Sequence, residues 1–211
     1  LEALNINYEL GAKYFELDLQ LTSDKKIVAV HNWSDWKKRV QYEGDNIPTL
    51  EVFLDYKIKN SFTPLGVNEI LDWFLKHPDA TLVTDKLNDA LLIKKTFNII
   101  KNNLIIELFT EESINKALSN NFTKILISER VAWRNKYATD YWNLRHSKKN
   151  VPYGFAVSKH TIYKKPVLFK TAKSLGLKVY VYHVNEEFKD YTLYSDGLES
   201  KVICDFHNYI D

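Results

Sequence analysis

Apolar and polar residues alternate between positions 14 and 21, YFELDLQL, and this pattern predicts a β-strand with two different faces. One face would carry Phe15, Leu17, Leu19 and Leu21. The other face would carry Glu16, Asp18 and Gln20. Two carboxylates on one face of an otherwise apolar strand need either water at an exposed edge or a bound cation.

Similar short apolar runs follow along the chain, separated by segments with helical spacing. They predict strands at 26–30, 81–85, 104–109, 124–128, 153–157, 178–184 and 201–204. Helical periodicity predicts helices at 1–13, 67–76, 89–102, 111–119, 164–176 and 188–195, with one or two more within 131–150. The segment 32–65 contains Gly44, Pro48 and Pro64 and is interpreted as an irregular excursion.

This alternation of strands and helices predicts a parallel sheet covered by helices, in a single domain spanning 1–211. Seven main strands open at Tyr14, Thr81, Leu104, Lys124, Tyr153, Lys178 and Lys201. The prediction is a TIM-like (β/α)8 barrel, which has eight strands. Because the sequence opens inside a predicted helix and contains no methionine, we expect the missing strand to precede Leu1. An open doubly wound sheet is the alternative.

Composition narrows the class of protein. Apolar residues make up 45% and charged residues 27%, with a net charge of +2 and no block of one sign, so nothing indicates nucleic-acid binding. Cys204 is the single cysteine, which excludes an internal disulfide. No apolar run reaches the roughly 18 residues that a membrane-spanning helix needs. The compartment and the oligomeric state stay open.

The candidate chemistry lies where predicted strands end, because parallel α/β folds place their sites at the C-terminal ends of strands. Glu16, Asp18 and Asp85 could meet there and offer oxygen ligands to Mg²⁺ or Ca²⁺. His31 ends the second apolar run and suits proton transfer, and Lys86 could anchor a phosphate. Each residue could also have an ordinary structural role instead. For example, His31 could be a polar surface residue, and Asp85 could cap the helix that follows it.

The order of these motifs resembles that of the glycerophosphodiester phosphodiesterase family. The matching stretches are LEALNINYELGAKYFELDLQLTSDKKIVAVHN at 1–32, LVTDK at 82–86, KVYVYHVN at 178–185 and VICDF at 202–206. The resemblance implies a TIM-like barrel that hydrolyses a small phosphodiester with one divalent cation. It also implies the roles of the site residues: Glu16, Asp18 and Asp85 as metal ligands, His31 as an acid/base catalyst and Lys86 as a phosphate contact.

The family carries a second catalytic histidine in its opening strand, which we expect upstream of Leu1. Without it the chain would be a poor catalyst or inactive. The expected substrate is a glycerophosphodiester or a related phosphorylated lipid or sugar. Three alternatives remain: a non-catalytic module that binds a phosphorylated sugar or lipid, a phospholipase-type enzyme that forms a cyclic phosphate, and an unrelated α/β enzyme with structural carboxylates.

Overall fold

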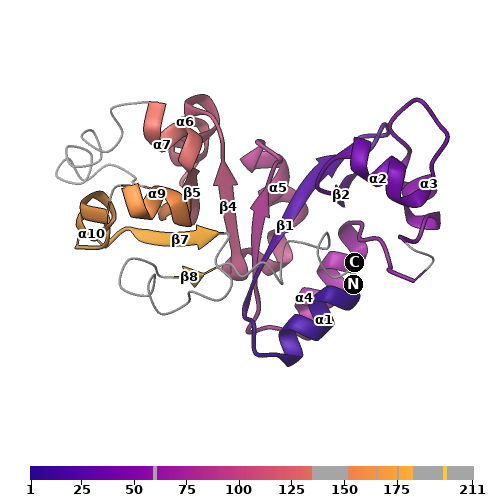
Figure 1. Ribbon diagram of the computed structural model, residues 1–211, viewed down its shortest axis with the longest axis horizontal. Helices are drawn as coiled ribbons and strands as arrows, with labels where there is room; N and C mark the ends of the chain where they lie inside the picture. Colours follow the sequence, from indigo (N-terminus) through magenta and orange to yellow (C-terminus); the bar gives the residue numbers. More distant parts are fainter. Residues whose placement is uncertain (59–60, 135–151, 165, 175, 183–196, 199–211) are drawn as a thin grey trace. The chain divides into compact units, whose positions relative to one another are not determined.

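A computed structural model of the chain describes residues 1–211 except 59–60, 135–151, 165, 175, 183–196 and 199–211 (Figure 1). The described residues fall into two compact units. The first comprises 1–87 and 92–104, and the second comprises 88–91 and the described residues from 105 onward.

The first unit is built on a strand pair and its helices. Its elements are α1 (Glu2–Glu9), β1 (Tyr14–Leu21), β2 (Ile27–Ala29), α2 (Trp33–Val40), α3 (Leu50–Asp55), α4 (Val67–Lys76), β3 (Thr81–Asp85), the C-terminal part of α5 (Ala90–Thr96) and the 3-10 helix η1 (Asn98–Asn103). Strand β1 pairs with β2 in an antiparallel sense and with β3 in a parallel sense. The predicted strands at 14–21 and 81–85 and the helix at 67–76 are confirmed in full.

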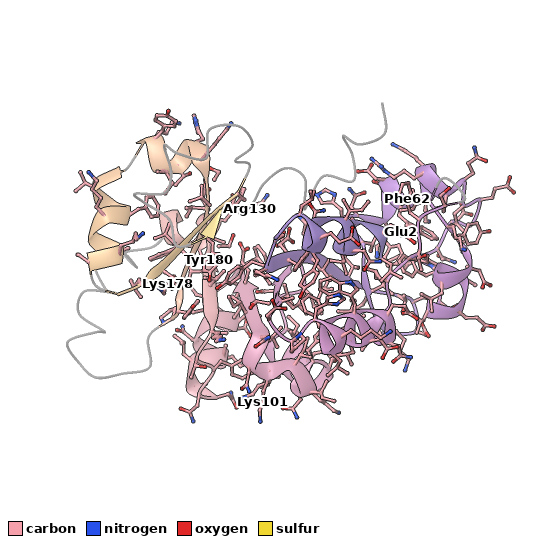
Figure 2. All side chains as sticks on the ribbon, turned by 90° about the horizontal axis from the view of Figure 1, so that it is seen from below. Glu2, Phe62, Lys101, Arg130, Lys178 and Tyr180 are labelled. Carbon is pink, nitrogen blue, oxygen red and sulfur yellow. The ribbon has the colours of Figure 1, made fainter. Side chains whose placement is uncertain are left out.

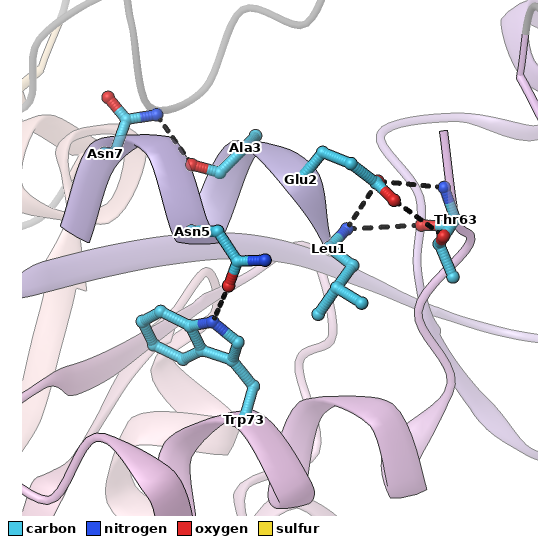
Figure 3. Close-up of polar contacts among 7 residues, drawn as sticks. All are labelled: Leu1, Glu2, Ala3, Asn5, Asn7, Thr63 and Trp73. Carbon is cyan, nitrogen blue, oxygen red and sulfur yellow. Dashed lines mark hydrogen bonds and ion pairs between the residues drawn. The ribbon is translucent and has the colours of Figure 1, made fainter. Parts of the chain in front are cut away.

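Helices α1 and α4 meet the apolar face of β1. Phe15 is fully buried, and its ring centroid lies 4.9 Å from that of Trp73 on α4. The Trp73 indole N–H donates to the side-chain oxygen of Asn5 on α1, over 2.7 Å (Figure 3). Glu2 accepts hydrogen bonds from the backbone and hydroxyl of Thr63 (Figure 3). Figure 2 labels Glu2 and Phe62, the residue before Thr63. These polar bonds fix α1 on a layer of aromatic side chains.

The segment 32–65 is not irregular as predicted, because it contains the helices α2 and α3. Side chains of Asn32 and Thr49 cap their N-termini by accepting backbone N–H groups. The helices bury an apolar cluster of their own around Val28, Trp36 and Phe53. Local capping and this cluster outweigh the turn signals on which the prediction depended.

Both ends of this segment return to β2. At its start, the chain leaves β2 through Val30 and His31 and reaches the N-cap of α2. At its end, Leu65 accepts a hydrogen bond from the backbone of Ala29 at 2.8 Å, and the next residue forms a bridge with Val28. The segment therefore leaves and rejoins the sheet at neighbouring points.

The second unit repeats strands and helices. Its elements are the N-terminal part of α5, β4 (Leu104–Leu108, from Ile105 onward), α6 (Glu111–Ser119), β5 (Ile125–Ser128), α7 (Glu129–Arg134), β6 (Gly154–Ser158), α9 (Lys159–Lys164), α10 (Pro166–Ser174), β7 (Lys178–Tyr182) and β8 (Gly197–Leu198). Its strands are parallel and follow in the sequential order β4-β5-β6-β7-β8. A doubly wound sheet reverses its strand order at a switch point, whereas this order is that of a barrel.

Several predictions for this unit differ from the structure or lie outside it. The helix predicted at 164–176 is two helices, α9 and α10, and the short strand β8 was not predicted. The helix at 188–195 and the strand at 201–204, with Cys204, lie outside the described residues, as does most of 131–150. Within the described parts of the chain, no helix is long and apolar enough to cross a membrane.

The start of α6 depends on a side-chain cap whose contribution can be measured. The Thr110 hydroxyl accepts the backbone N–H of Ser113 at 3.2 Å and the amide of Asn88 at 2.9 Å. We expect Thr110→Ala to lower the free energy of unfolding by about 1 kcal/mol, measured by urea denaturation. Thr110→Ser keeps the hydroxyl and should stay near wild type; equal losses in both variants would contradict the capping role.

Candidate metal centre

The polar face of β1 is the starting point of the site. Phe15 and Leu19 are fully buried, so the opposite face of the strand presents Glu16 and Asp18, which are half-buried. The burial follows the predicted alternation at Phe15 and Leu19, whereas Leu17 is half-buried like Glu16 and Asp18. A carboxylate on this face is neither freely hydrated nor in the apolar core.

Parallel pairing with β3 adds a third carboxylate. Asp18 lies directly opposite Asp85, and Glu16 lies opposite Val83. Opposed residues of paired strands point to the same face, so Asp85 joins the carboxylates of β1. One oxygen each from Glu16, Asp18 and Asp85 lie within 4.8 Å of one another. The structure brings together the three residues that the sequence singled out.

The spacing and chemistry of this group suit a hard cation. Carboxylate oxygens bind Mg²⁺ or Ca²⁺ at about 2.0–2.6 Å, so two oxygens on one ion lie at most about 4–5 Å apart. The separations found here are within that limit. Three carboxylates and no thiolate form a donor set that favours such an ion over zinc. The residues present therefore fit one divalent cation.

Lys86 follows Asp85 and places a positive charge beside the carboxylates. Its Nζ lies 3.6 Å from Asp18 Oδ1 and 3.7 Å from Asp85 Oδ2. Burial lowers the pKa of Lys86, but the negative charges of Asp85, Asp18 and Glu16 outweigh it, so the net pKa is raised. Lys86 is thus positively charged and partly balances the negative charge of the three carboxylates.

The backbone at Lys86 is unusual. Its φ is 65°, in the left-handed region that residues other than glycine seldom adopt. The backbone N–H of Lys86 donates to Asp85 Oδ1 at 2.5 Å, which ties the carboxylate to the turn that follows β3. This turn orients both side chains toward the end of β1.

The electrostatics of the group are dominated by Asp18. Its side chain is 16% exposed. Burial and then the negative charge of Asp85 raise the pKa of Asp18 to about 7, against the opposing effect of Lys86. Near neutral pH the group without a cation therefore carries a proton about half of the time. A divalent cation would displace that proton, because it stabilises the ionised carboxylate.

His31 lies at the same end of β1 but is exposed. Its backbone carbonyl accepts a hydrogen bond from Gln20 Nε2 at 2.6 Å, and Gln20 lies on the carboxylate face two residues beyond Asp18. The backbone N–H of Val30 donates to the carbonyl of Asp18 at 2.8 Å. His31 is therefore anchored next to the site without belonging to the carboxylate cluster itself.

Another carboxylate outside this cluster, that of Glu129, accepts several hydrogen bonds and was not singled out from the sequence. It accepts hydrogen bonds from the backbone of Ser158 at 2.6 Å, from the hydroxyl of Thr161, and from the Tyr182 hydroxyl at 3.0 Å. Burial raises the pKa of Glu129, but these hydrogen bonds outweigh it and the net pKa is lowered. Its bonds join the ends of β5, β6 and β7, which is a structural role.

The strand order and site place the chain in the class of TIM-like α/β barrels, and comparisons with solved structures agree. A glycerophosphodiester phosphodiesterase from Thermotoga maritima aligns with a TM-score of 0.69 and 17% identity over 96% of this chain and 85% of its own. A glycerophosphodiester phosphodiesterase from Parabacteroides distasonis aligns with a TM-score of 0.71 and 16% identity, over 95% of this chain and 84% of its own. A third, from Agrobacterium tumefaciens, aligns with a TM-score of 0.67 and 12% identity, over 93% of this chain and 87% of its own.

At these identities the likeness establishes the fold, so the predicted TIM-like α/β architecture is confirmed. The similar structures carry the name of the family whose motifs the sequence resembles. No protein-family model matches the chain.

Proposed function

We propose that the chain is a metal-dependent phosphodiesterase that hydrolyses a glycerophosphodiester or a related phosphorylated lipid or sugar. The observation that carries the proposal is the convergence of Glu16 and Asp18 on β1 with Asp85, the last residue of β3, and with Lys86 beside them. The fold shared with glycerophosphodiester phosphodiesterases gives this cluster its chemical context.

In this proposal Glu16, Asp18 and Asp85 hold one divalent cation, Mg²⁺ or Ca²⁺. When bound, such a cation offsets the negative charge that develops on phosphoryl oxygens during displacement. The carboxylates keep it at the C-terminal end of the strands, where α/β barrels bind substrates. Burial and the negative charge of Asp85 raise the pKa of Asp18, and a bound cation would offset both effects.

Lys86 and His31 take the other two roles. The ammonium group of Lys86 is close enough to the carboxylates to contact a phosphate that binds over them. His31 provides an imidazole at the same strand end for acid/base chemistry at the attacking or the leaving oxygen. Hydrolysis then breaks the bond between phosphorus and the leaving oxygen, and water supplies the incoming oxygen and the balancing protons.

The test is turnover of bis-p-nitrophenyl phosphate and of glycerophosphodiesters by the purified full-length protein, with Mg²⁺ or Ca²⁺. We expect activity that EDTA abolishes and that the cation restores. Phosphorus NMR of the products should show a phosphomonoester, whereas a cyclic phosphate would indicate internal attack by a substrate hydroxyl. Calorimetric binding of cation and phosphodiester without any turnover would overturn hydrolysis in favour of a binding module.

Lys86 offers a second, smaller prediction. Lys86→Gln removes the charge that contacts the phosphate, so KM should rise about 10-fold, equivalent to about 1.4 kcal/mol of binding. Lys76→Gln, at an exposed lysine on α4, is the matched control and should leave KM unchanged. Equal KM values for wild type and Lys86→Gln would exclude a phosphate contact by Lys86.

A further inference from the structure

The side-chain amide of Asn32 has an orientation that its neighbours determine. Asn32 caps α2, and its Oδ1 accepts the backbone N–H of Asp35 at 2.8 Å. The hydroxyl of Ser34 also lies 2.8 Å from Oδ1. Because a backbone N–H can only donate, the atom that faces it must be the oxygen. The nitrogen of the amide is therefore on the other side.

That nitrogen contacts the ring of His31. Asn32 Nδ2 lies 2.9 Å from His31 Nδ1 and 2.7 Å from Asp35 Oδ2. An amide NH₂ has two hydrogens and does not accept, so one hydrogen points at each partner. His31 Nδ1 must then offer its lone pair. A neutral imidazole with an accepting Nδ1 carries its proton on Nε2.

We propose that Asn32 is a positioning residue that holds His31 as the Nε2–H tautomer, with Asp35 orienting the amide. A proton on Nδ1 would face the N–H of Asn32 and break their hydrogen bond. The hydrogen bond from Gln20 to the His31 carbonyl holds the backbone of the same residue. The ring is thus fixed at Nδ1 and presents a donor at Nε2.

The consequence for catalysis rests on the proposed function. The site would use His31 as a hydrogen-bond donor to the oxygen on which negative charge develops, and the base would be another group. Such a hydrogen bond strengthens as the charge appears and needs no full proton transfer from the neutral ring. A neutral histidine used as a donor has precedent in triosephosphate isomerase, a TIM barrel.

The experiment replaces the amide while keeping the helix cap. Asn32→Asp retains an N-cap side chain, but its second oxygen accepts a hydrogen bond and should draw the imidazole proton onto Nδ1. Asn32→Ser keeps a cap and offers no amide to the ring, so the tautomer preference should weaken. Unchanged circular dichroism of both variants shows that the fold is retained.

The tautomer is read from nitrogen-15 NMR of the imidazoles in the full chain at about pH 9, with His31 assigned by its absence in His31→Gln. We expect the proton on Nε2 in wild type and on Nδ1 in Asn32→Asp. A proton on Nδ1 in wild type, or no response to Asn32→Asp, would overturn the proposal. In an active protein, kcat of Asn32→Asp should fall on the order of 10²-fold or more.

This readout does not depend on turnover. If the chain hydrolyses no phosphodiester but shows the expected tautomers, the proposed function fails and the role of Asn32 stands. If hydrolysis is found and the tautomers are not as expected, the role of Asn32 fails and the proposed function stands.

Discussion

Glu16→Gln is expected to reduce kcat/KM for a phosphodiester on the order of 10³-fold. The substitution keeps the size of the side chain but removes one of three charges that lie within 4.8 Å of one another. A bound cation contributes several kcal/mol of transition-state stabilisation, and about 4 kcal/mol corresponds to that factor. Calorimetry should also show weaker Mg²⁺ or Ca²⁺ binding by the variant.

The matched control is Glu9→Gln, at an exposed glutamate in the last turn of α1. This variant loses the same charge at the opposite end of β1 and should keep wild-type turnover. Full activity in Glu16→Gln would show that the carboxylate cluster does not carry the reaction.

The second large effect is on stability. Below pH 4 Asp18 is protonated in both the folded and the unfolded chain, and burial and Asp85 raise its folded pKa to about 7. Between these values the folded state binds the extra proton, so stability falls as pH rises. From pH 5 to pH 8 the metal-free wild type should lose about 3 kcal/mol of unfolding free energy relative to Asp18→Asn.

Urea denaturation with EDTA at the two pH values measures this difference. The amide introduced by Asp18→Asn has no proton to lose, so the comparison reports the titration of Asp18 together with its electrostatic coupling to Asp85. A saturating divalent cation should remove the destabilisation of wild type at pH 8, because it binds the ionised carboxylate. Parallel stability curves for wild type and Asp18→Asn in EDTA would contradict the raised pKa.

The strands were the most predictable part of the fold, because short apolar runs bounded by turn signals form its buried strands. The alternation of 14–21 and the apolar run of 81–85 predict β1 and β3 to the residue. Helices α2 and α3 could not be found in the same way. They are short, and what stabilises them is a cap at each start and the contact of Trp36 with Phe53, whose rings lie 5.4 Å apart.

The site was predictable where it depends on strand direction. Alternation along one strand grouped Glu16 with Asp18, and the rule that sites lie at the C-terminal ends of parallel strands added Asp85. The left-handed backbone of Lys86 and the role of Asn32 were not predicted, because both depend on local backbone and side-chain geometry that the apolar–polar pattern does not specify. A histidine followed by an N-cap asparagine is the local signal that could have indicated the latter.

The segment between Asn32 and Leu65 has the geometry of an interchangeable insert. Its first stem continues directly from β2, its second stem contacts Ala29 and Val28 of β2, and its helices pack around Trp36 and Phe53 against Val28. A chain segment whose ends are already adjacent can change in length with a small change in entropy. Replacing it with a longer or shorter module would alter the surroundings of His31 while leaving the carboxylates of β1 and β3 in register. In the proposed function, substrate range and metal binding would thereby be separable traits.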